Sequence, residues 1–126
     1  MVHLFSYGTL QDPETQMEAI GRTIDKSMPA YTKGSVRSMA VGARTYNVLH
    51  PFKPGMPDRL VPGRLLNVSK EELDRLDLFE GVGAVYDRKL IDIFDSDGKP
   101  HKATQKAFAY VARPGRTNGS IPLCLF

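Results

Sequence analysis

Hydrophobic residues near the start of the chain, in residues 2–7, fall on both faces of an extended backbone. Val2 and Leu4 share one face, and Phe5 and Tyr7 share the other. Strands with two apolar faces are buried on both sides, whereas strands at a surface alternate apolar and polar residues. The pattern therefore predicts a strand over residues 2–7 that lies inside the fold.

The next stretch carries the start and stop signals of a short helix over residues 13–20. Asp12 is a good N-cap residue, and Pro13 takes the first helical position, where its missing N–H group is not needed. Gly21 supplies the stop, because glycine readily adopts the left-handed conformation that commonly follows a helix.

A second helix is indicated by the stretch SKEELDRLDLFEG. Ser69 is the N-cap, and Glu72 three residues later completes a capping box, in which each side chain accepts a hydrogen bond from the backbone N–H of the other residue. One face of this helix is apolar at three-residue spacing, through Leu73, Leu76 and Phe79. Gly81 and Gly83 are expected to end the helix.

Extended structure is indicated between the two helices. Residues 33–49 are strand-like and are punctuated by Gly34 and Gly42. Residues 50–58, HPFKPGMPD, hold three prolines and one glycine, which predicts a loop. The stretch RLVPGRLLNV then predicts another strand, in which Pro62 and Gly63 favour a bulge or an edge, since proline donates no hydrogen bond to a ladder.

Two strands are predicted after the second helix. The segments VYDRKLIDIF and ATQKAFAYVA flank DSDGKP, in which Asp97-Gly98 is a strong turn signal, so we expect a hairpin with a longer loop. The whole chain then has five or six strands in clusters and two helices, which indicates the α+β class and a sheet curled toward a barrel. Its 126 residues suit one domain, residues 1–126. The apolar residues of the last segment are expected to pack against the body of the protein, and these are Ile121, Leu123, Leu125 and Phe126.

Composition narrows the classes of partner. The formal charge is +3, but basic and acidic residues are interspersed, so no nucleic-acid surface is indicated, and the small basic excess suits an anionic small molecule equally well. No apolar run approaches the length of a membrane span, and no signal peptide is evident, so we expect no membrane association. Because no exposed apolar helix is obvious, we expect a monomer.

Cysteine and histidine usage gives two further expectations. The single cysteine, Cys124, excludes a disulfide within the chain and favours a cytoplasmic location, and its apolar neighbours indicate inert packing. His3, His50 and His101 are scattered without the spacing of metal ligands, so no metal site is predicted.

Glu80 is the first candidate for chemistry. It follows Leu76 by four residues, so it projects from the apolar face of the second helix. Partial burial and the negative end of the helix both disfavour a charged carboxyl, and we expect them to raise the pKa of Glu80, as a general acid or base near neutral pH requires. Two alternatives are a glutamate that points to water and a structural ion pair with a cation such as Arg88.

The stretch Tyr-Gly-Thr-Leu at residues 7–10 is the second candidate. Gly8 permits backbone angles that are closed to other residues, and the N–H groups of Gly8, Thr9 and Leu10 can then form a concave nest for an anion. Thr9 adds a hydroxyl donor, and Tyr7 adds an aromatic wall with a polar tip. The lysine and glycine spacing of a phosphate-binding P-loop are missing. The alternative is a plain turn between strand and helix.

Tyr86 and Arg88 are the third candidate, because they alternate onto one face of the strand that follows the glycines. Such a pair can orient a carboxylate ligand or Glu80 itself. The alternative is an arginine that faces solvent beside a half-buried tyrosine.

Four segments in order, LFSYGTL, LVPGRLLNV, LDLFEG and VYDRKLIDI, make the chain resemble the γ-glutamyl cyclotransferase-like family. The Tyr-Gly-Thr-Leu loop is similar to that of the branch that includes γ-glutamylamine cyclotransferase, whereas the glutathione-directed branch more often has Tyr-Gly-Ser-Asn-Leu. The resemblance runs from about Leu4 to Tyr110, which is most of the chain.

The resemblance implies a small mixed β-barrel with packed helices and an enzyme of the acyltransferase or lyase type that needs no metal or cofactor. The free α-amine of a γ-glutamyl amine or peptide attacks the substrate's own side-chain carbonyl, which forms 5-oxoproline and releases the amine. Carried over by position, the acid/base residue is Glu80. The substrate-binding residues are then Tyr7, Gly8, Thr9, Leu10, Tyr86 and Arg88.

Three features depart from the family pattern, and one of them is the C-terminal stretch IPLCLF, which has no counterpart in the family. The stretch GARTYNVLHP lacks the aromatic-proline pair of many members, and the loop HPFKPGMPD is unusually rich in proline. Both would belong to the outer wall of the pocket, so the identity of the leaving amine stays open. The alternative to an enzyme is a non-catalytic module on the same fold that binds small carboxylates or another protein.

Overall fold

The computed structural model describes residues 1–41, 43–57, 59–79, 86–94 and 105–112. In chain order the elements are β1 (Val2–Ser6), the 3₁₀ turn η1 (Thr9–Gln11), α1 (Pro13–Ile20), β2 (Ser27–Val41), β3 (Arg44–Pro51), β4 (Leu60–Val68), α2 (Lys70–Phe79), β5 (Tyr86–Ile93) and β6 (Gln105–Ala112).

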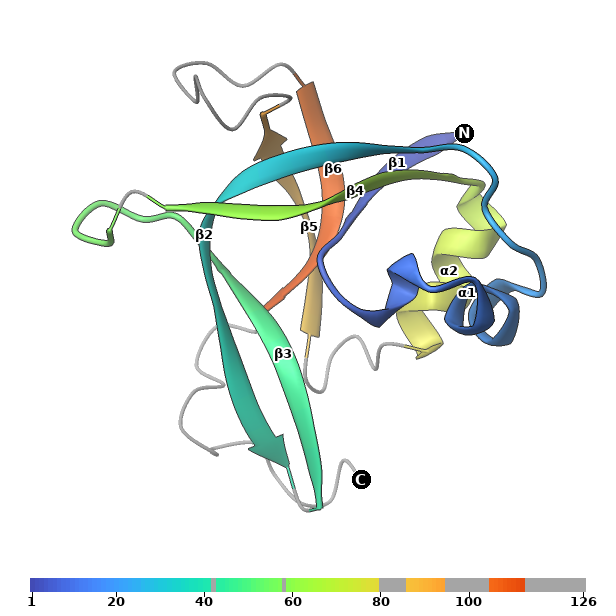
Figure 1. Ribbon diagram of the computed structural model, residues 1–126, viewed down its shortest axis with the longest axis horizontal. Coiled ribbons are helices and arrows are strands. Elements are labelled where there is room, and N and C mark those ends of the chain that lie inside the picture. The colour runs from blue at the N-terminus through green and yellow to red at the C-terminus, as the bar shows by residue number, and fades with distance from the viewer. Residues whose placement is uncertain (42, 58, 80–85, 95–104, 113–126) are drawn as a thin grey trace.

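The strands form a sheet that closes on itself (Figure 1). Their order is β1-β4-β2-β3-β6-β5, and β1 pairs again with β6. The long pairings are antiparallel, whereas β6 runs parallel to β1 and β3 and meets them at Leu4↔Phe108 and Leu49↔Val111. A closed ring of parallel and antiparallel pairs, with β5 added on β6, confirms the predicted α+β class and small mixed barrel with packed helices.

Strand β2 serves two neighbours in succession. Its first part pairs with β4 as far as Lys33, and its second part pairs with β3 from Gly34 onward. Gly34 has a φ of +154°, which L side chains rarely adopt, and a Cβ there would collide with the carbonyl oxygen of His50. Glycine therefore allows β2 to change partner and carry the sheet around the barrel.

The Pro62-Gly63 pair lies beyond the end of the β1 ladder. That ladder stops where Ser6 faces Arg64, so Pro62 has only β2 as a strand partner among the described residues. This local edge confirms one of the two predicted settings for the proline. A Cβ at Gly63 would lie 2.6 Å from Cζ of Phe5, so only glycine lets the Phe5 ring pack on this backbone.

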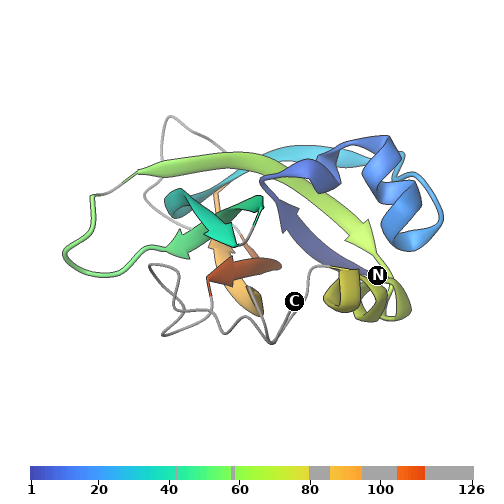
Figure 2. The same ribbon diagram turned by 90° about the horizontal axis from the view of Figure 1, so that it is seen from below.

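Neighbouring residues on the strands belong to two different cores. Leu4 packs beneath the helices with Ile20, Leu73 and Leu76, whereas Phe5 packs in the barrel interior. The two helices lie side by side on one side of the barrel (Figures 1 and 2). The prediction that the first strand is buried on both faces is therefore confirmed, because one face meets the helices and the other fills the barrel.

Both predicted helices form with the predicted starts. Helix α1 spans Pro13–Ile20 and ends at Gly21 in the left-handed conformation, although the Asp12 side chain makes no capping hydrogen bond to the described residues. In α2 the capping box is complete. The N–H of Glu72 donates to Oγ of Ser69 at 3.1 Å, and the N–H of Ser69 donates to Oε1 of Glu72 at 2.9 Å.

The strand bounds differ from the prediction where distant pairing decides them. Strand β2 begins at Ser27, before the strand-like stretch that starts at Lys33, because β4 pairs with it there. The two strands of the last hairpin pair from Tyr86↔Ala112 to Ile93↔Gln105, which confirms their pairing.

Glu80, the glycines at 81 and 83, the turn at residues 97–98 and the segment 113–126 lie outside the described residues. None of the described helices is long and apolar enough to cross a membrane.

Candidate functional site

A cavity of about 370 Å³ opens beside the loop of residues 7–10. Its walls come from β1 and this loop, from α1, from β3 and β6, from the last residue of α2 and from the first residue of β5. The volume falls in the range of roughly 300–1,000 Å³ that is usual for small-molecule pockets. Segments from both halves of the chain therefore meet at one hollow.

Most of the predicted site residues line this cavity. They are Tyr7, Gly8, Thr9, Leu10 and Tyr86. Arg88 does not belong to the lining, and its contacts are given below. Glu80 is outside the described residues, but Phe79, the residue directly before it, lines the cavity.

The loop leaves β1 and makes a single 3₁₀ turn before α1. The carbonyl oxygen of Gly8 accepts hydrogen bonds from the backbone N–H of Gln11 at 3.2 Å and from its side-chain amide at 3.1 Å. Within the part of the chain that the structure describes, the N–H groups of Gly8, Thr9 and Leu10 donate to no acceptor. These amides remain able to bind an anionic ligand.

The backbone of Gly8 is not in the left-handed conformation. Its φ is −136° and its ψ is −146°, and a Cβ built on it would meet none of the described atoms within 4 Å. Among the described residues, the loop backbone beside Gly8 is therefore open. That opening lets a ligand approach the amides.

Tyr7 has a second role that the sequence did not indicate. Its hydroxyl accepts a hydrogen bond from the N–H of Leu49 at 2.9 Å and donates one to the carbonyl of Tyr110 at 2.6 Å. Strands β3 and β6 meet nearby at Leu49↔Val111. The hydroxyl thus bridges the seam of the barrel, and the residue also lines the cavity.

Three tyrosines from three strands line the cavity together. The rings of Tyr46 and Tyr86 are 6.4 Å apart at 79°, and those of Tyr86 and Tyr110 are 6.4 Å apart at 74°. Both are favourable edge-to-face arrangements. The hydroxyl of Tyr86 donates to the carbonyl of Asn47 at 2.8 Å. Sequence reasoning missed Tyr46 and Tyr110, because β3 and β6 reach the site only through the closure of the barrel.

Arg88 binds a carboxylate of α2. Its Nη1 lies 2.6 Å from Oδ2 of Asp77, and its guanidinium carbon lies 5.2 Å from the centre of the Phe108 ring. The hydroxyl of Tyr110 donates to the other oxygen, Oδ1 of Asp77, at 2.9 Å. Arg88 is therefore an ion-pair partner of α2, and the structure shows it neither facing solvent alone nor lining the cavity.

Gln16 holds the end of the loop and was also missed. It is 3% exposed, and its Nε2 donates to the carbonyl of Leu10 at 3.0 Å while its Oε1 accepts from the N–H of Ile24 at 2.7 Å. A signal was present in the sequence, since Gln16 lies one turn before Ile20 on the buried face of α1.

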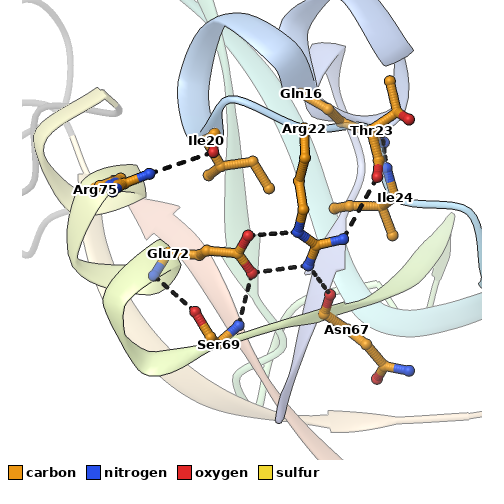
Figure 3. A network of polar contacts seen from close by, with 9 residues as sticks. All are labelled: Gln16, Ile20, Arg22, Thr23, Ile24, Asn67, Ser69, Glu72 and Arg75. Carbon is orange, nitrogen blue, oxygen red and sulfur yellow. Dashed lines mark hydrogen bonds and ion pairs between the residues drawn. The ribbon is translucent and has the colours of Figure 1, made fainter.

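An ion pair joins the segment after α1 to the start of α2 (Figure 3). Nη2 of Arg22 donates to Oε1 of Glu72 at 2.7 Å and to the carbonyl of Asn67 at 3.2 Å, and Nε of Arg22 donates to the other oxygen of Glu72. The hydrogen bond from Arg22, helped by those from Ser69, lowers the pKa of Glu72 to about 2 against the opposing effect of burial. Both helices are thereby held in place beside the cavity.

The described lining has little formal charge. It contains one carboxylate, Glu18 of α1, and neither lysine nor arginine. Among the described residues no group of three or more His, Cys, Asp or Glu side chains is placed to hold a metal ion. The lining therefore offers backbone amides and hydroxyl groups, rather than basic side chains, to an anionic ligand.

Comparison with known proteins identifies the family. Residues 4–123 match the family described as Gamma-glutamyl cyclotransferase, AIG2-like. No curated protein matches the chain.

Solved structures show the same fold. The crystal structure of an AIG2-like protein from Mus musculus is 23% identical, with a TM-score of 0.65, over 100% of this chain and 83% of that one. Two solution structures from Arabidopsis thaliana are each 24% identical, with TM-scores of 0.64. They cover 88% and 99% of this chain, and this chain spans 61% and 74% of their lengths.

Proposed function

The chain belongs to the gamma-glutamyl cyclotransferase, AIG2-like family, and from this premise we propose that it releases 5-oxoproline from a γ-glutamyl amine or peptide. One observation carries the proposal. The loop of residues 7–10 and the end of α2, which leads directly into Glu80, line the same cavity. The proposed anion-binding loop and the residue that directly precedes the proposed proton-transfer group therefore line one cavity.

In the proposed complex the loop binds the charged end of the γ-glutamyl group. The amides of Gly8, Thr9 and Leu10 hold the α-carboxylate or the oxyanion that develops at the reacting carbonyl. The rings of Tyr46, Tyr86 and Tyr110 pack against the methylene groups of the substrate. The described lining includes no basic side chain, so the backbone amides of the loop are its donors for a negatively charged group.

Glu80 acts as the general base and then as the general acid. The α-ammonium of the substrate has an ordinary pKa of about 8 and must lose a proton before its nitrogen can attack. Glu80 accepts that proton, the nitrogen bonds to the side-chain carbonyl carbon, and the carbonyl electron pair moves to oxygen. When this pair returns, the bond to the leaving nitrogen breaks and Glu80 gives its proton to the departing amine. The ring nitrogen still carries two protons after the attack, and it loses one of them to the solvent to leave the neutral lactam.

The geometry that this reaction needs is modest. Nucleophile and electrophile belong to one molecule, so the enzyme has to fold the substrate until the amine faces the carbonyl. A cavity with an anion-binding loop on one side and tyrosine rings on another can impose such a fold. No redox step or further reactant is required, because the products contain all the atoms of the substrate.

The direct test is product formation. The purified protein is incubated with a γ-glutamyl alkylamine and with a γ-glutamyl dipeptide, and 5-oxoproline is measured by mass spectrometry. We expect turnover of at least one of them, and we expect Glu80→Gln to reduce kcat about 100- to 10,000-fold without a change in Tm. Glu71→Gln is the matched control, because Glu71 is an exposed glutamate in the first turn of α2 and should keep full activity.

Two results would contradict the proposal in different ways. Full activity of Glu80→Gln would remove Glu80 from the mechanism. A protein that forms no 5-oxoproline, but whose Tm rises on addition of 5-oxoproline or another small carboxylate, would be a binding module instead of an enzyme.

A further inference from the structure

The last turn of α2 is held by two strands that are distant from it in sequence. Asp77 binds Arg88 of β5 through Oδ2 at 2.6 Å and Tyr110 of β6 through Oδ1 at 2.9 Å. Both oxygens of one carboxylate are therefore engaged, by partners on two adjacent strands. We call Asp77, Arg88 and Tyr110 the α2 clamp.

Local physics disfavours a carboxylate in this place. The C-terminal end of a helix carries partial negative charge, which repels an aspartate in the last turn, and α2 has no basic residue in its last turn to offset it. Arg88 supplies the missing positive charge from outside the helix. The side chains of Arg88 and Asp77 are only 27% and 25% exposed, so solvent screens this pair less than an open surface pair.

Tyr110 connects the clamp to the opposite side of the cavity. Its hydroxyl donates to Asp77, and its carbonyl oxygen accepts the hydrogen bond from the hydroxyl of Tyr7. One residue of β6 thus touches both the end of α2 and the loop that begins at Tyr7. Phe79, two residues after Asp77, lines the same cavity.

We propose that the α2 clamp sets the position of the end of α2 relative to the loop of residues 7–10, so that Asp77, Arg88 and Tyr110 are positioning residues for the reaction. The inference rests on the proposed function, since the residue that follows Phe79 is the proposed acid/base. Helix ends fray when nothing holds them, and a displacement of about 1 Å at a reacting group can lower a rate about 100-fold. Asp77 and Arg88 act through the helix and do not touch the substrate, whereas the ring of Tyr110 also lines the cavity.

Kinetic measurements distinguish this positioning role from direct binding of the substrate by Arg88. If Arg88 bound the substrate carboxylate, Arg88→Met would raise KM, and Asp77→Asn would leave Arg88 free to bind more tightly. If the clamp positions α2, both substitutions lower kcat by a similar factor with little change in KM, and the double variant is no worse than either single one.

The experiment measures kcat, KM and local hydrogen exchange for Asp77→Asn, Arg88→Met, Arg88→Lys and the double variant Asp77→Asn/Arg88→Met. We expect a 10- to 100-fold loss of kcat for the first two and their combination, and faster exchange of the amides at the end of α2. Arg88→Lys keeps the positive charge and should recover most of the activity.

Asp92→Asn is the matched control. Asp92 pairs with Lys106 on the same two strands at 3.1 Å, but both side chains are more than half exposed, at 57% and 65%, and neither lines the cavity. The Asp92→Asn substitution should change neither kcat nor the hydrogen exchange of the amides in α2.

Three results would overturn the clamp. They are an unchanged kcat in Asp77→Asn, an increase of KM alone in Arg88→Met, or unchanged exchange at the end of α2 in both variants. Because exchange is measured without substrate, it tests the clamp even if the wild-type protein forms no 5-oxoproline. A failure of the proposed function is then distinct from a failure of the clamp.

Discussion

The two ends of helix α2 are held in different ways. At the first end, Ser69 and Glu72 are three residues apart and cap each other, and Arg22 adds an ion pair. At the second end, Asp77 has partners 11 and 33 residues further along the chain, Arg88 and Tyr110. The capping box at the first end is local to α2, whereas the contacts at the second end form only when β5 and β6 lie beside the helix.

The difference also concerns what each end does. Ser69 and Glu72 at the start of α2 do not line the cavity. Glu72 binds Arg22 in the segment after α1, and Arg22 also donates to the carbonyl of Asn67 in β4, so these contacts stabilise the fold. The end of α2 contributes Phe79 to the cavity wall. We therefore expect substitutions at the first end to change stability and substitutions at the second end to change activity.

The largest effect on stability is expected from Glu72→Ala. It removes the capping box and both hydrogen bonds from Arg22, and the free energy of unfolding should fall by about 2–3 kcal/mol, a range that allows for the 38% exposure of Arg22. Chemical denaturation measures this loss. The control Glu71→Ala should change stability by less than about 0.5 kcal/mol. A lower kcat in the folded Glu72→Ala protein would break the comparison.

A smaller loss of stability is expected when the wild-type protein is acidified. The folded-state pKa of Glu72, about 2, lies below its ordinary value of 4.5, so its ion pair stabilises the fold fully above pH 4.5. This contribution is lost as the pH falls from 4.5 toward 2, and we expect about 1–2 kcal/mol after allowance for the partial exposure of Arg22.

Glu72→Gln isolates that contribution. Glutamine keeps the acceptor of the capping box but has no charge to lose. Between about pH 6 and pH 2, the free energy of unfolding, measured by chemical denaturation, should therefore fall less steeply for Glu72→Gln than for the wild-type protein. Parallel curves for the two proteins would show that Glu72 does not carry the acid sensitivity.

The smallest effect on stability, with a clear effect on rate, is expected from Tyr110→Phe. It removes the hydroxyl that donates to Asp77 and leaves the carbonyl that accepts from Tyr7. The free energy of unfolding should fall by about 0.5–1.5 kcal/mol. Since Arg88 still holds Asp77, kcat should fall by only about two- to ten-fold, measured as 5-oxoproline release. If Tyr110→Phe lost more stability than Glu72→Ala, the second end of α2 would contribute more to stability than the first, contrary to our expectation.

Much of the fold was predictable because its signals are local. The capping box at Ser69, the helix stop at Gly21 and the two apolar faces of β1 each depend on residues within a few positions of one another. Such patterns act through the geometry of one helix turn or one strand. The candidate loop at residues 7–10 was found in the same way, through a change from strand to turn.

Other features depend on pairs of residues that are far apart. The start of β2 at Ser27 depends on β4, and the hydroxyl of Tyr7 bridges Leu49 and Tyr110. Tyr46 and Tyr110 carry no mark of a site in their own segments. Arg88 was predicted to orient a ligand or Glu80, and the structure shows that it binds Asp77, a neighbour that no local pattern indicates.

By itself, the sequence determined which segments are helices and strands, which faces are buried and which residues are candidates for chemistry. These properties follow from hydrogen bonds and side-chain directions that repeat within a single element. Only the tertiary structure decided that the loop, three tyrosines and the end of α2 share one cavity, and that Asp77 is tied to two strands. These groups come together only when the barrel closes. Their contacts join segments that are far apart in the sequence, and no pattern within one segment indicates its distant neighbour.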